Sequence, residues 1–161
     1  MEIPKPLKEH EWLQQLVGTW TWEAECDGGP GQPPVRNTGT EVVRSLGGLW
    51  TVGEGASKSP EGEECNMITT LGFDPATQRF VGTFIASVMT HLWPYNGTLD
   101  DSGTVLVLDS EGPGFSGDGK LCRYQDTIKI VDADHRILSS QVMEESGTWK
   151  HFMTSHYRRL K

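Results

Sequence analysis

Short runs in which apolar and polar residues alternate recur about ten times along the 161-residue chain. In the first of them, residues 18–26, the apolar side chains Trp20, Trp22 and Ala24 share one face and polar side chains share the other. A repeat of two residues is typical of a β-strand that is buried on one face only. The pattern therefore predicts an all-β protein built from many short strands.

Turn residues separate most of these runs, as in Gly47-Gly48 and Asp74-Pro75, so consecutive strands are expected to be antiparallel neighbours. Such a meander leaves two exposed edges, and closure into a barrel removes them. We therefore predict a single antiparallel up-and-down barrel, with a bend between the fifth and sixth strands around residues 89–92. The ten strands are expected near residues 19–26, 38–46, 49–56, 66–74, 78–89, 90–99, 103–110, 120–132, 135–144 and 147–159.

One stretch near the N-terminus has helical rather than strand periodicity. Within residues 7–17, Leu13 and Leu16 belong to an apolar stripe, and a glycine follows the stretch. We expect a short helix that closes one end of the barrel, preceded by a flexible N-terminus over residues 1–6. The whole chain, 1–161, is expected to form one lipocalin-like domain.

Charge and cysteine content restrict the classes of partner and compartment. The net charge is −8, from 22 acidic and 14 basic residues, which opposes binding to nucleic acid or to an anionic membrane. The three cysteines Cys26, Cys65 and Cys122 are odd in number and widely spaced, which favours reduced thiols inside a cell. The sequence has no apolar run of signal-peptide or membrane-span length, so we expect a cytoplasmic protein.

The first strand carries a recognisable motif. Gly18-x-Trp20, entered from a short helix, resembles the signature of the calycin superfamily, which includes lipocalins and fatty-acid-binding proteins. The resemblance implies a calycin-like barrel in which a basic residue of the last strand, Arg158 or Arg159, packs across Trp20. Trp20 is then expected to be a core residue that closes the barrel.

A second resemblance covers nearly the whole chain. It is to the mainly bacterial family named domain of unknown function 1579, and it implies no activity, because the family has none assigned and fold does not determine function. The stretches that carry it are 41–50 (EVVRSLGGLW), 71–75 (LGFDP), 89–93 (MTHLW) and 152–154 (FMT).

Two stripes of soft, aromatic and hydrogen-bonding side chains form the candidate binding site. Counting by twos places each stripe on one face of an extended segment: Met89, His91, Trp93 and Tyr95 in the first, and Trp149, His151, Met153 and Tyr157 in the second. Such surfaces are typical of a pocket for a flat or amphipathic molecule. We therefore predict that the barrel binds a small hydrophobic or amphipathic molecule. Alternatively, the stripes lie outside, beneath the helix or in a homodimer interface of a structural protein that binds no ligand.

An enzyme is a second alternative. If Glu54 or Asp126 faced inward and paired with Arg44 or Arg123, His91 could act as acid or base in a small-molecule isomerase or lyase. No spacing in the sequence enforces these contacts, and buried charges in barrels more often satisfy one another than react.

A haem-binding barrel is a third alternative, because a neutral imidazole is a common metal ligand and an open barrel can house a porphyrin. A related calycin group binds haem through a histidine. The candidates here are His91, His151 and His156, and none has Cys, Asp or Glu at metal-ligand spacing. We therefore expect no cofactor and no metal.

Overall fold

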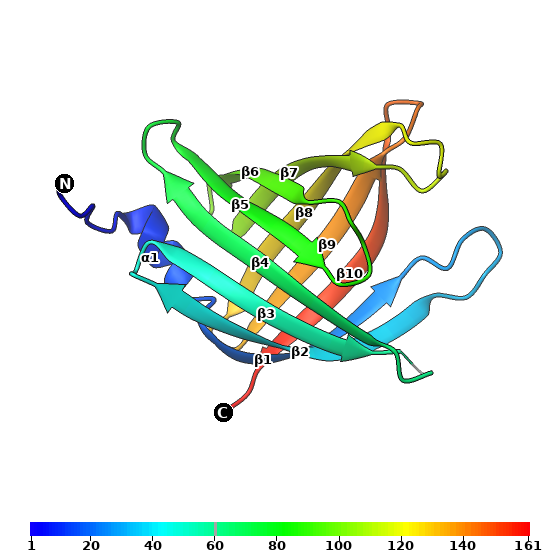
Figure 1. Cartoon of the computed structure of the whole chain (residues 1–161), viewed down its shortest axis with the longest axis horizontal. Helices are drawn as coiled ribbons and strands as arrows, with labels where there is room; N and C mark the ends of the chain where they lie inside the picture. Colours follow the sequence, from blue (N-terminus) through cyan, green and yellow to red (C-terminus); the bar gives the residue numbers. More distant parts are fainter. Residues whose placement is uncertain (60) are drawn as a thin grey trace.

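A computed structural model describes residues 1–59 and 61–161, and over these residues one short helix precedes ten strands (Figure 1). The protein is all-β, as the alternating pattern predicts. The helix is α1 (Lys8–Gln14), and the strands are β1 (Gly18–Cys26), β2 (Val35–Leu46), β3 (Trp50–Lys58), β4 (Glu64–Asp74), β5 (Arg79–Ala86), β6 (Trp93–Leu99), β7 (Val105–Pro113), β8 (Leu121–Asp132), β9 (His135–Met143) and β10 (Trp149–Arg159).

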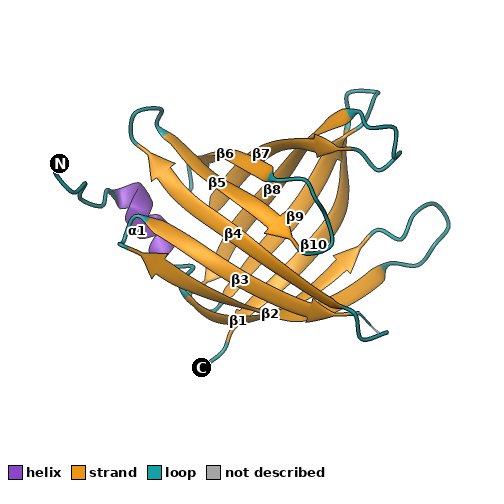
Figure 2. Ribbon diagram, in the orientation of Figure 1, coloured by secondary structure: helices purple, strands orange, loops and turns teal. Residues whose placement is uncertain are grey.

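Every strand pairs antiparallel with its neighbours in the chain, and β1 also pairs with β10, so the sheet closes into a barrel (Figure 2). Trp20 lies opposite Arg159 at this closing seam, and Cys26 lies opposite Met153. The predicted up-and-down barrel is confirmed. Closure pairs the strand edges that an open meander would leave exposed.

Two connections differ from the expected boundaries. β2 begins at Val35, three residues earlier than expected, because Val35 pairs with Cys26 at the end of β1. Residues 87–92 connect β5 to β6 and do not form a strand, so the bend that the sequence predicts is longer than expected. This second difference places Met89 and His91 of the first candidate stripe in the connection and leaves Trp93 and Tyr95 in β6.

Helix α1 lies at one end of the barrel, near the ends of β3 and β4 (Figure 1). Its side chain Leu13 is fully buried, and His10 is buried as well. The Nδ1 atom of His10 accepts a hydrogen bond from the Leu7 N–H (2.9 Å), so Nε2 carries the proton and donates to the Phe73 carbonyl (3.0 Å). These contacts fix the helix against the barrel. Among the described residues, no helix has the length and apolar character needed to span a membrane.

Candidate functional site

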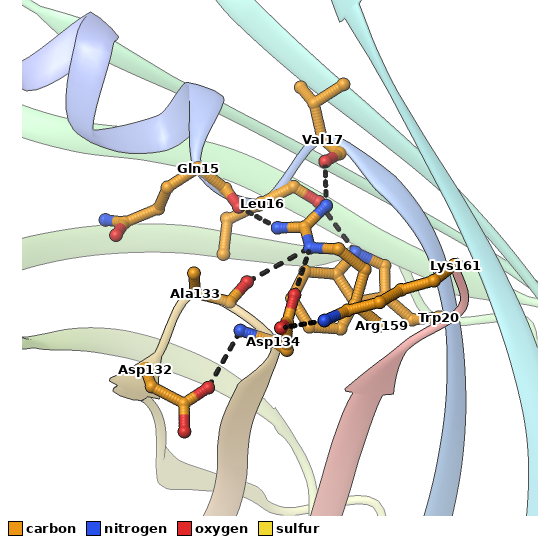
Figure 3. Close-up of polar contacts among 9 residues, drawn as sticks. All are labelled: Gln15, Leu16, Val17, Trp20, Asp132, Ala133, Asp134, Arg159 and Lys161. Carbon is orange, nitrogen blue, oxygen red and sulfur yellow. Dashed lines mark hydrogen bonds and ion pairs between the residues drawn. The ribbon is translucent and has the colours of Figure 1, made fainter.

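The closed end of the barrel is sealed by Arg159 and Trp20 (Figure 3). The guanidinium of Arg159 lies over the indole of Trp20, with Cζ 4.2 Å from the ring centroid. Its Nη1 and Nη2 atoms donate to the carbonyls of Val17 (2.6 Å) and Gln15 (2.9 Å), and the Trp20 indole donates to Leu16 (2.9 Å). The carbonyls at the end of the helical segment, which lack helical partners, are thereby satisfied.

Gly18 is required at this point by both its conformation and its neighbour. Its φ angle is +142°, in a range that L side chains rarely adopt, and a Cβ at this position would collide with Nη1 of Arg159. The Gly18-x-Trp20 motif thus provides space for the arginine and an aromatic surface beneath it. Arg158, the other residue that the resemblance suggests, is exposed on the outside of the barrel.

A cavity of about 640 Å³ occupies the barrel above this floor, and all ten strands contribute to its lining. Leu16, Leu71 and Ile128 line it near the helix, whereas Glu63 and Phe115 line it at the opposite end. Since the strand ends at Cys26, Val35 and Pro113 also lie at that opposite end, the cavity opens away from α1. The barrel therefore encloses a cavity that is closed at the end near α1, here called the floor, and open at the opposite end, here called the mouth.

Asp126 of β8 is the most unusual group in the cavity wall. Its Oδ2 accepts a hydrogen bond of 2.5 Å from the Tyr95 hydroxyl, and its Oδ1 accepts one of 2.6 Å from the Ser140 hydroxyl. Among the described residues, no lysine, arginine or histidine pairs with this carboxylate. Asp126 is therefore a carboxylate held by neutral donors inside the barrel.

The surroundings of this cluster perturb its acidities. Burial raises the pKa of Asp126, although the hydrogen bonds from Ser140 and Tyr95 act in the opposite direction. Burial, together with the neighbouring Asp126 charge, raises the pKa of Tyr95 well above its usual range. The surface of Asp126 that remains accessible belongs to the cavity lining. A group with these properties in a cavity is a candidate functional residue.

A second pair of charges lies nearer the floor. Nη2 of Arg136 in β9 is 2.5 Å from Oε1 of Glu41 in β2, and both residues are buried. The Arg136 guanidinium also lies over two rings, with Cζ 4.0 Å from the centroid of Tyr157 and 4.7 Å from that of Trp20. These two charges compensate each other, so among the described residues Asp126 is the interior carboxylate of the lining that has no cationic partner.

Two serine hydroxyls in the wall are buried without a hydrogen-bond partner among the described residues, those of Ser110 and Ser155. Ser155 is only 2% exposed. Ser110 lies opposite Tyr124, two residues from Asp126 along β8, and Ser155 lies opposite Leu138, two residues from Ser140 along β9. Ser110 therefore lies diagonal to Asp126 on the neighbouring strand toward the mouth, whereas Ser155 lies two strands away from Asp126 and closer to the floor.

Aromatic side chains gather at the mouth. The ring centroids of Trp93 and Tyr124 are 4.9 Å apart, and those of Phe115 and Phe152 are 5.1 Å apart, both in edge-to-face geometry. The Trp93 ring covers Gly112, where a Cβ would collide with it. Phe115 is 74% exposed although it lines the cavity, so the rim presents apolar surface to solvent.

Five of the eight candidate binding residues lie in the cavity lining: Met89, Trp93, Tyr95, Met153 and Tyr157. In the first stripe, Met89 reaches the cavity from the connection before β6, and its sulfur accepts a hydrogen bond from the Trp93 indole (3.1 Å). Trp93 and Tyr95 then alternate inward along β6, as counting by twos predicts.

The other three candidates, His91, Trp149 and His151, are not among the lining residues. His91 lies in the connection before β6, and its Nε2 bonds the Glu111 carbonyl at 3.0 Å. In β10 a bulge between His151 and Met153 reverses the alternation. His151 consequently lies opposite the outward Gln141, whereas Met153, Ser155 and Tyr157 after the bulge face inward.

Of the four charged residues considered for an inward pair, the structure places Asp126 inside and the other three outside. Glu54, Arg44 and Arg123 are exposed. Glu54 and Arg44 each adjoin an inward residue in their strands, and strand geometry turns adjacent side chains to opposite faces. His91 contacts a backbone carbonyl and not Asp126, so the arrangement required for His91-based acid–base chemistry is not present in the described residues.

The histidines considered for haem also lie outside the lining. The Nδ1 atom of His156 is 2.9 Å from Nε2 of His135, and His151 bonds the Thr154 hydroxyl at 2.7 Å. Over residues 1–59 and 61–161, no three His, Cys, Asp or Glu side chains are grouped to hold a metal ion.

Sequence reasoning missed the Glu41–Arg136 pair and the partners of Asp126. Alternation with Val43 along the same strand places Glu41 inward, and this is the available signal for Glu41. Arg136 is 95 positions away in the chain, and no local pattern connects it to Glu41.

Comparison with known proteins identifies a family and a shared fold. A family model described as "Protein of unknown function (DUF1579)" matches residues 5–159. Comparison with curated proteins gives no significant match.

Three solved structures are similar over nearly the whole chain. The crystal structure of Rv2717c from M. tuberculosis has 14% identity and a TM-score of 0.69, covering 98% of this chain and 100% of that one. A redesigned β-barrel has 9% identity and a TM-score of 0.50, covering 92% and 94%. The structure of EF1p2_mFAP2b bound to DFHBI has 9% identity and a TM-score of 0.50, covering 94% and 98%. At these identities the similarity establishes the fold alone.

Proposed function

The chain belongs to the DUF1579 family of proteins of unknown function, and we propose that it reversibly binds a small apolar or amphipathic molecule inside its barrel. The observation that carries this proposal is the cavity of about 640 Å³, which is open at one end and sealed by the Arg159–Trp20 contact at the other. Small-molecule sites are typically preformed cavities of about 300–1,000 Å³.

The composition of the lining supports the same proposal. Most of the wall is apolar or aromatic, with contributions such as Met67, Leu71 and Phe84, and only a few polar groups converge on it. An apolar lining favours transfer of an apolar ligand from water, and a few fixed polar groups orient it. A purely structural barrel would gain stability by filling this space with side chains, because cavities lower stability.

The rim provides a second line of support. Phe115 and Trp93 offer aromatic surface where a ligand would enter, and Met89 adds a flexible apolar side chain. Aromatic and methionine side chains accommodate flat or irregular apolar bodies. Among the similar structures, EF1p2_mFAP2b is bound to DFHBI, and the proposal is compatible with that use of the fold.

A cavity-filling substitution tests the proposal. Ala24 lines the cavity from β1, and Ala24→Trp would add a large side chain to the space that the ligand occupies. N-phenylnaphthylamine, a neutral dye that fluoresces in apolar surroundings, is expected to bind the wild-type protein with one site and to bind Ala24→Trp at least about tenfold more weakly. The matched control is Glu23→Trp, the adjacent and exposed position on the outer face of the same strand.

Each variant must keep a cooperative melting transition, because loosely packed states also take up such dyes. Failure of the dye to bind the wild-type protein, or equal loss of binding in Ala24→Trp and Glu23→Trp, would contradict the proposal.

A further inference from the structure

We propose that the cavity selects amphipathic cations, molecules whose apolar body fills the barrel and whose protonated amine pairs with Asp126. This inference deepens the proposed function and rests on it. It specifies the charge and the polar group of the ligand, which the cavity volume alone leaves open.

The hydrogen bonds of Asp126 leave room for a cationic donor. An ionised carboxylate offers about four lone-pair positions. Tyr95 and Ser140 each occupy one of them, one on each oxygen. Both hydroxyls donate, which is the arrangement that suits the ionised form of Asp126. The remaining positions on the two oxygens can accept hydrogen bonds from an ammonium group.

The charge balance of the lining also favours a cation. Among the described residues, the lining contains four carboxylates, Glu41, Glu63, Glu64 and Asp126, and one cationic side chain, Arg136. Glu41 is paired with Arg136, and Glu64 at the rim is 3.6 Å from Lys58. The interior therefore carries an excess of negative charge within a chain of net charge −8. A cleft lined by one sign of charge concentrates ligands of the other sign.

The Ser110 hydroxyl offers a further acceptor for the same group. An ammonium has three N–H donors and no acceptor, whereas a hydroxyl offers two lone pairs. Ser110 is buried without a hydrogen-bond partner among the described residues, and it lies diagonal to Asp126 on the neighbouring strand β7. One carboxylate with a neutral acceptor on the neighbouring strand suits the N–H donors of an ammonium group.

Desolvation explains why a neutral or anionic ligand would bind less well. Any ligand that fills the cavity displaces water from the Asp126 carboxylate, and removing an ion from water without a partner is costly. An amine replaces the lost water with a charge-assisted hydrogen bond. An alcohol replaces it with a neutral one, and a carboxylate adds repulsion.

Three ligands with the same apolar chain test the inference: decylamine, decanol and decanoate. Each is titrated below its aggregation concentration against the complex of the protein with N-phenylnaphthylamine at neutral pH. We expect decylamine to bind about tenfold or more tightly than decanol, as a charge-assisted hydrogen bond would give, and decanoate to bind most weakly. In Asp126→Asn the advantage of the amine over the alcohol should disappear, while the affinity for decanol stays within about twofold.

Asp109→Asn is the matched control. Asp109 is the outward residue next to Ser110 in β7, where it accepts a hydrogen bond from Gln125, and its replacement changes the net charge by the same amount. It should leave the preference for the amine unchanged. Loss of the preference in Asp109→Asn as well as in Asp126→Asn would assign it to overall charge and overturn the inference.

The order of affinities in the wild-type protein decides the question even if Asp126→Asn does not fold. Equal binding of decylamine and decanol would overturn the cation inference and leave the proposed function standing. Failure of the dye and all three ligands to bind would instead overturn the proposed function itself.

Discussion

Glu41 and Arg136 form an ion pair across the inside of the barrel, with Nη2 of Arg136 2.5 Å from Oε1 of Glu41. The two residues belong to β2 and β9, which are separated in the sheet by β1 and β10. Arg136 also covers the Tyr157 ring at 4.0 Å. The pair therefore connects strands that share no backbone hydrogen bonds, directly above the barrel floor.

Removing one member of this pair should lower the free energy of unfolding more than removing both. Glu41→Gln leaves the buried Arg136 charge without its partner, and we expect the free energy of unfolding to fall by about 3–5 kcal/mol. In the double variant Glu41→Gln with Arg136→Met no unpaired charge remains, so the loss should be smaller than in Glu41→Gln alone. Urea denaturation followed by tryptophan fluorescence measures both. A double variant whose loss equals or exceeds that of Glu41→Gln alone would contradict this account.

The contact between Arg159 and Trp20 leads to a prediction about hydrogen-bond geometry. Arg159→Lys keeps the charge but cannot bond the Val17 and Gln15 carbonyls together while covering the indole. We expect it to lower the free energy of unfolding by about 1–3 kcal/mol. Arg158→Lys, on the exposed neighbour, should change it by less than about 0.5 kcal/mol. If the two substitutions changed the free energy of unfolding equally, the two hydrogen bonds of the Arg159 guanidinium would not be what stabilises the floor.

Truncation of Trp20 tests the packing of the same floor. The side chain is 1% exposed, and Trp20→Ala would remove both the stacking surface and the indole bond to Leu16. We expect a loss of about 3–5 kcal/mol, as for other large aromatic truncations in packed cores. A loss below about 1 kcal/mol in urea denaturation would mean that Trp20 does not close the barrel.

The sequence predicted the architecture well because the dominant signal is local. Alternation with a period of two specifies strands, and short turns between them specify antiparallel neighbours, so the order of the sheet follows from the order of the chain. The closing pair of β1 and β10 is the single long-range step, and it was predicted from the need to remove two open edges.

The direction of individual side chains was less predictable, because one extra residue reverses the alternation. The bulge at Phe152 turns Trp149 and His151 outward, and the 87–92 connection removes His91 from the strand pattern. Asp126 and Ile128 line the cavity on the inner face of β8. Its partners Tyr95 and Ser140 come from β6 and β9, and only the closed barrel brings them together.

The raised pKa of Asp126 should give stability a specific dependence on pH. Burial is the largest cause of the rise, and the neighbours Tyr95 and Tyr157 stay neutral because burial raises their pKa values too. Between the unfolded and folded pKa values of Asp126, the folded protein binds more protons than the unfolded chain. The free energy of unfolding contributed by Asp126 therefore falls as pH rises through this interval.

The Asp126→Asn variant has no titrating carboxyl group at this position. The decrease in the free energy of unfolding that Asp126 causes as pH rises should therefore be absent from the variant. We expect the unfolding free energy of the variant minus that of the wild type to increase as pH rises above about 4, and to level off above the folded pKa of Asp126. Urea denaturation at a series of pH values measures this difference. A difference that stays constant, or decreases with pH, would show that the pKa of Asp126 is not raised.

Substitutions of Trp93 and Trp149 test most directly whether the aromatic stripes line a binding pocket or form a subunit interface. Both belong to the stripes that the sequence singles out, but Trp93 lines the cavity mouth beside Tyr124, whereas Trp149 lies outside the cavity with Arg123 over its ring. Trp93→Ala should weaken binding of N-phenylnaphthylamine by about 1–3 kcal/mol, the scale of one lost buried side-chain contact. Trp149→Ala should leave the dye affinity unchanged.

Both variants must retain a cooperative melting transition for the comparison to report on binding, since a loosened barrel would also bind the dye. Size-exclusion chromatography on the same samples follows the oligomeric state. If Trp93→Ala kept full dye affinity and converted a dimer to a monomer, the aromatic rim would be a subunit interface, and its role in ligand binding would have to be abandoned. Weaker dye binding with an unchanged elution volume is the result that the geometry of the mouth predicts, because the Trp93 ring lies over Gly112 and faces the cavity.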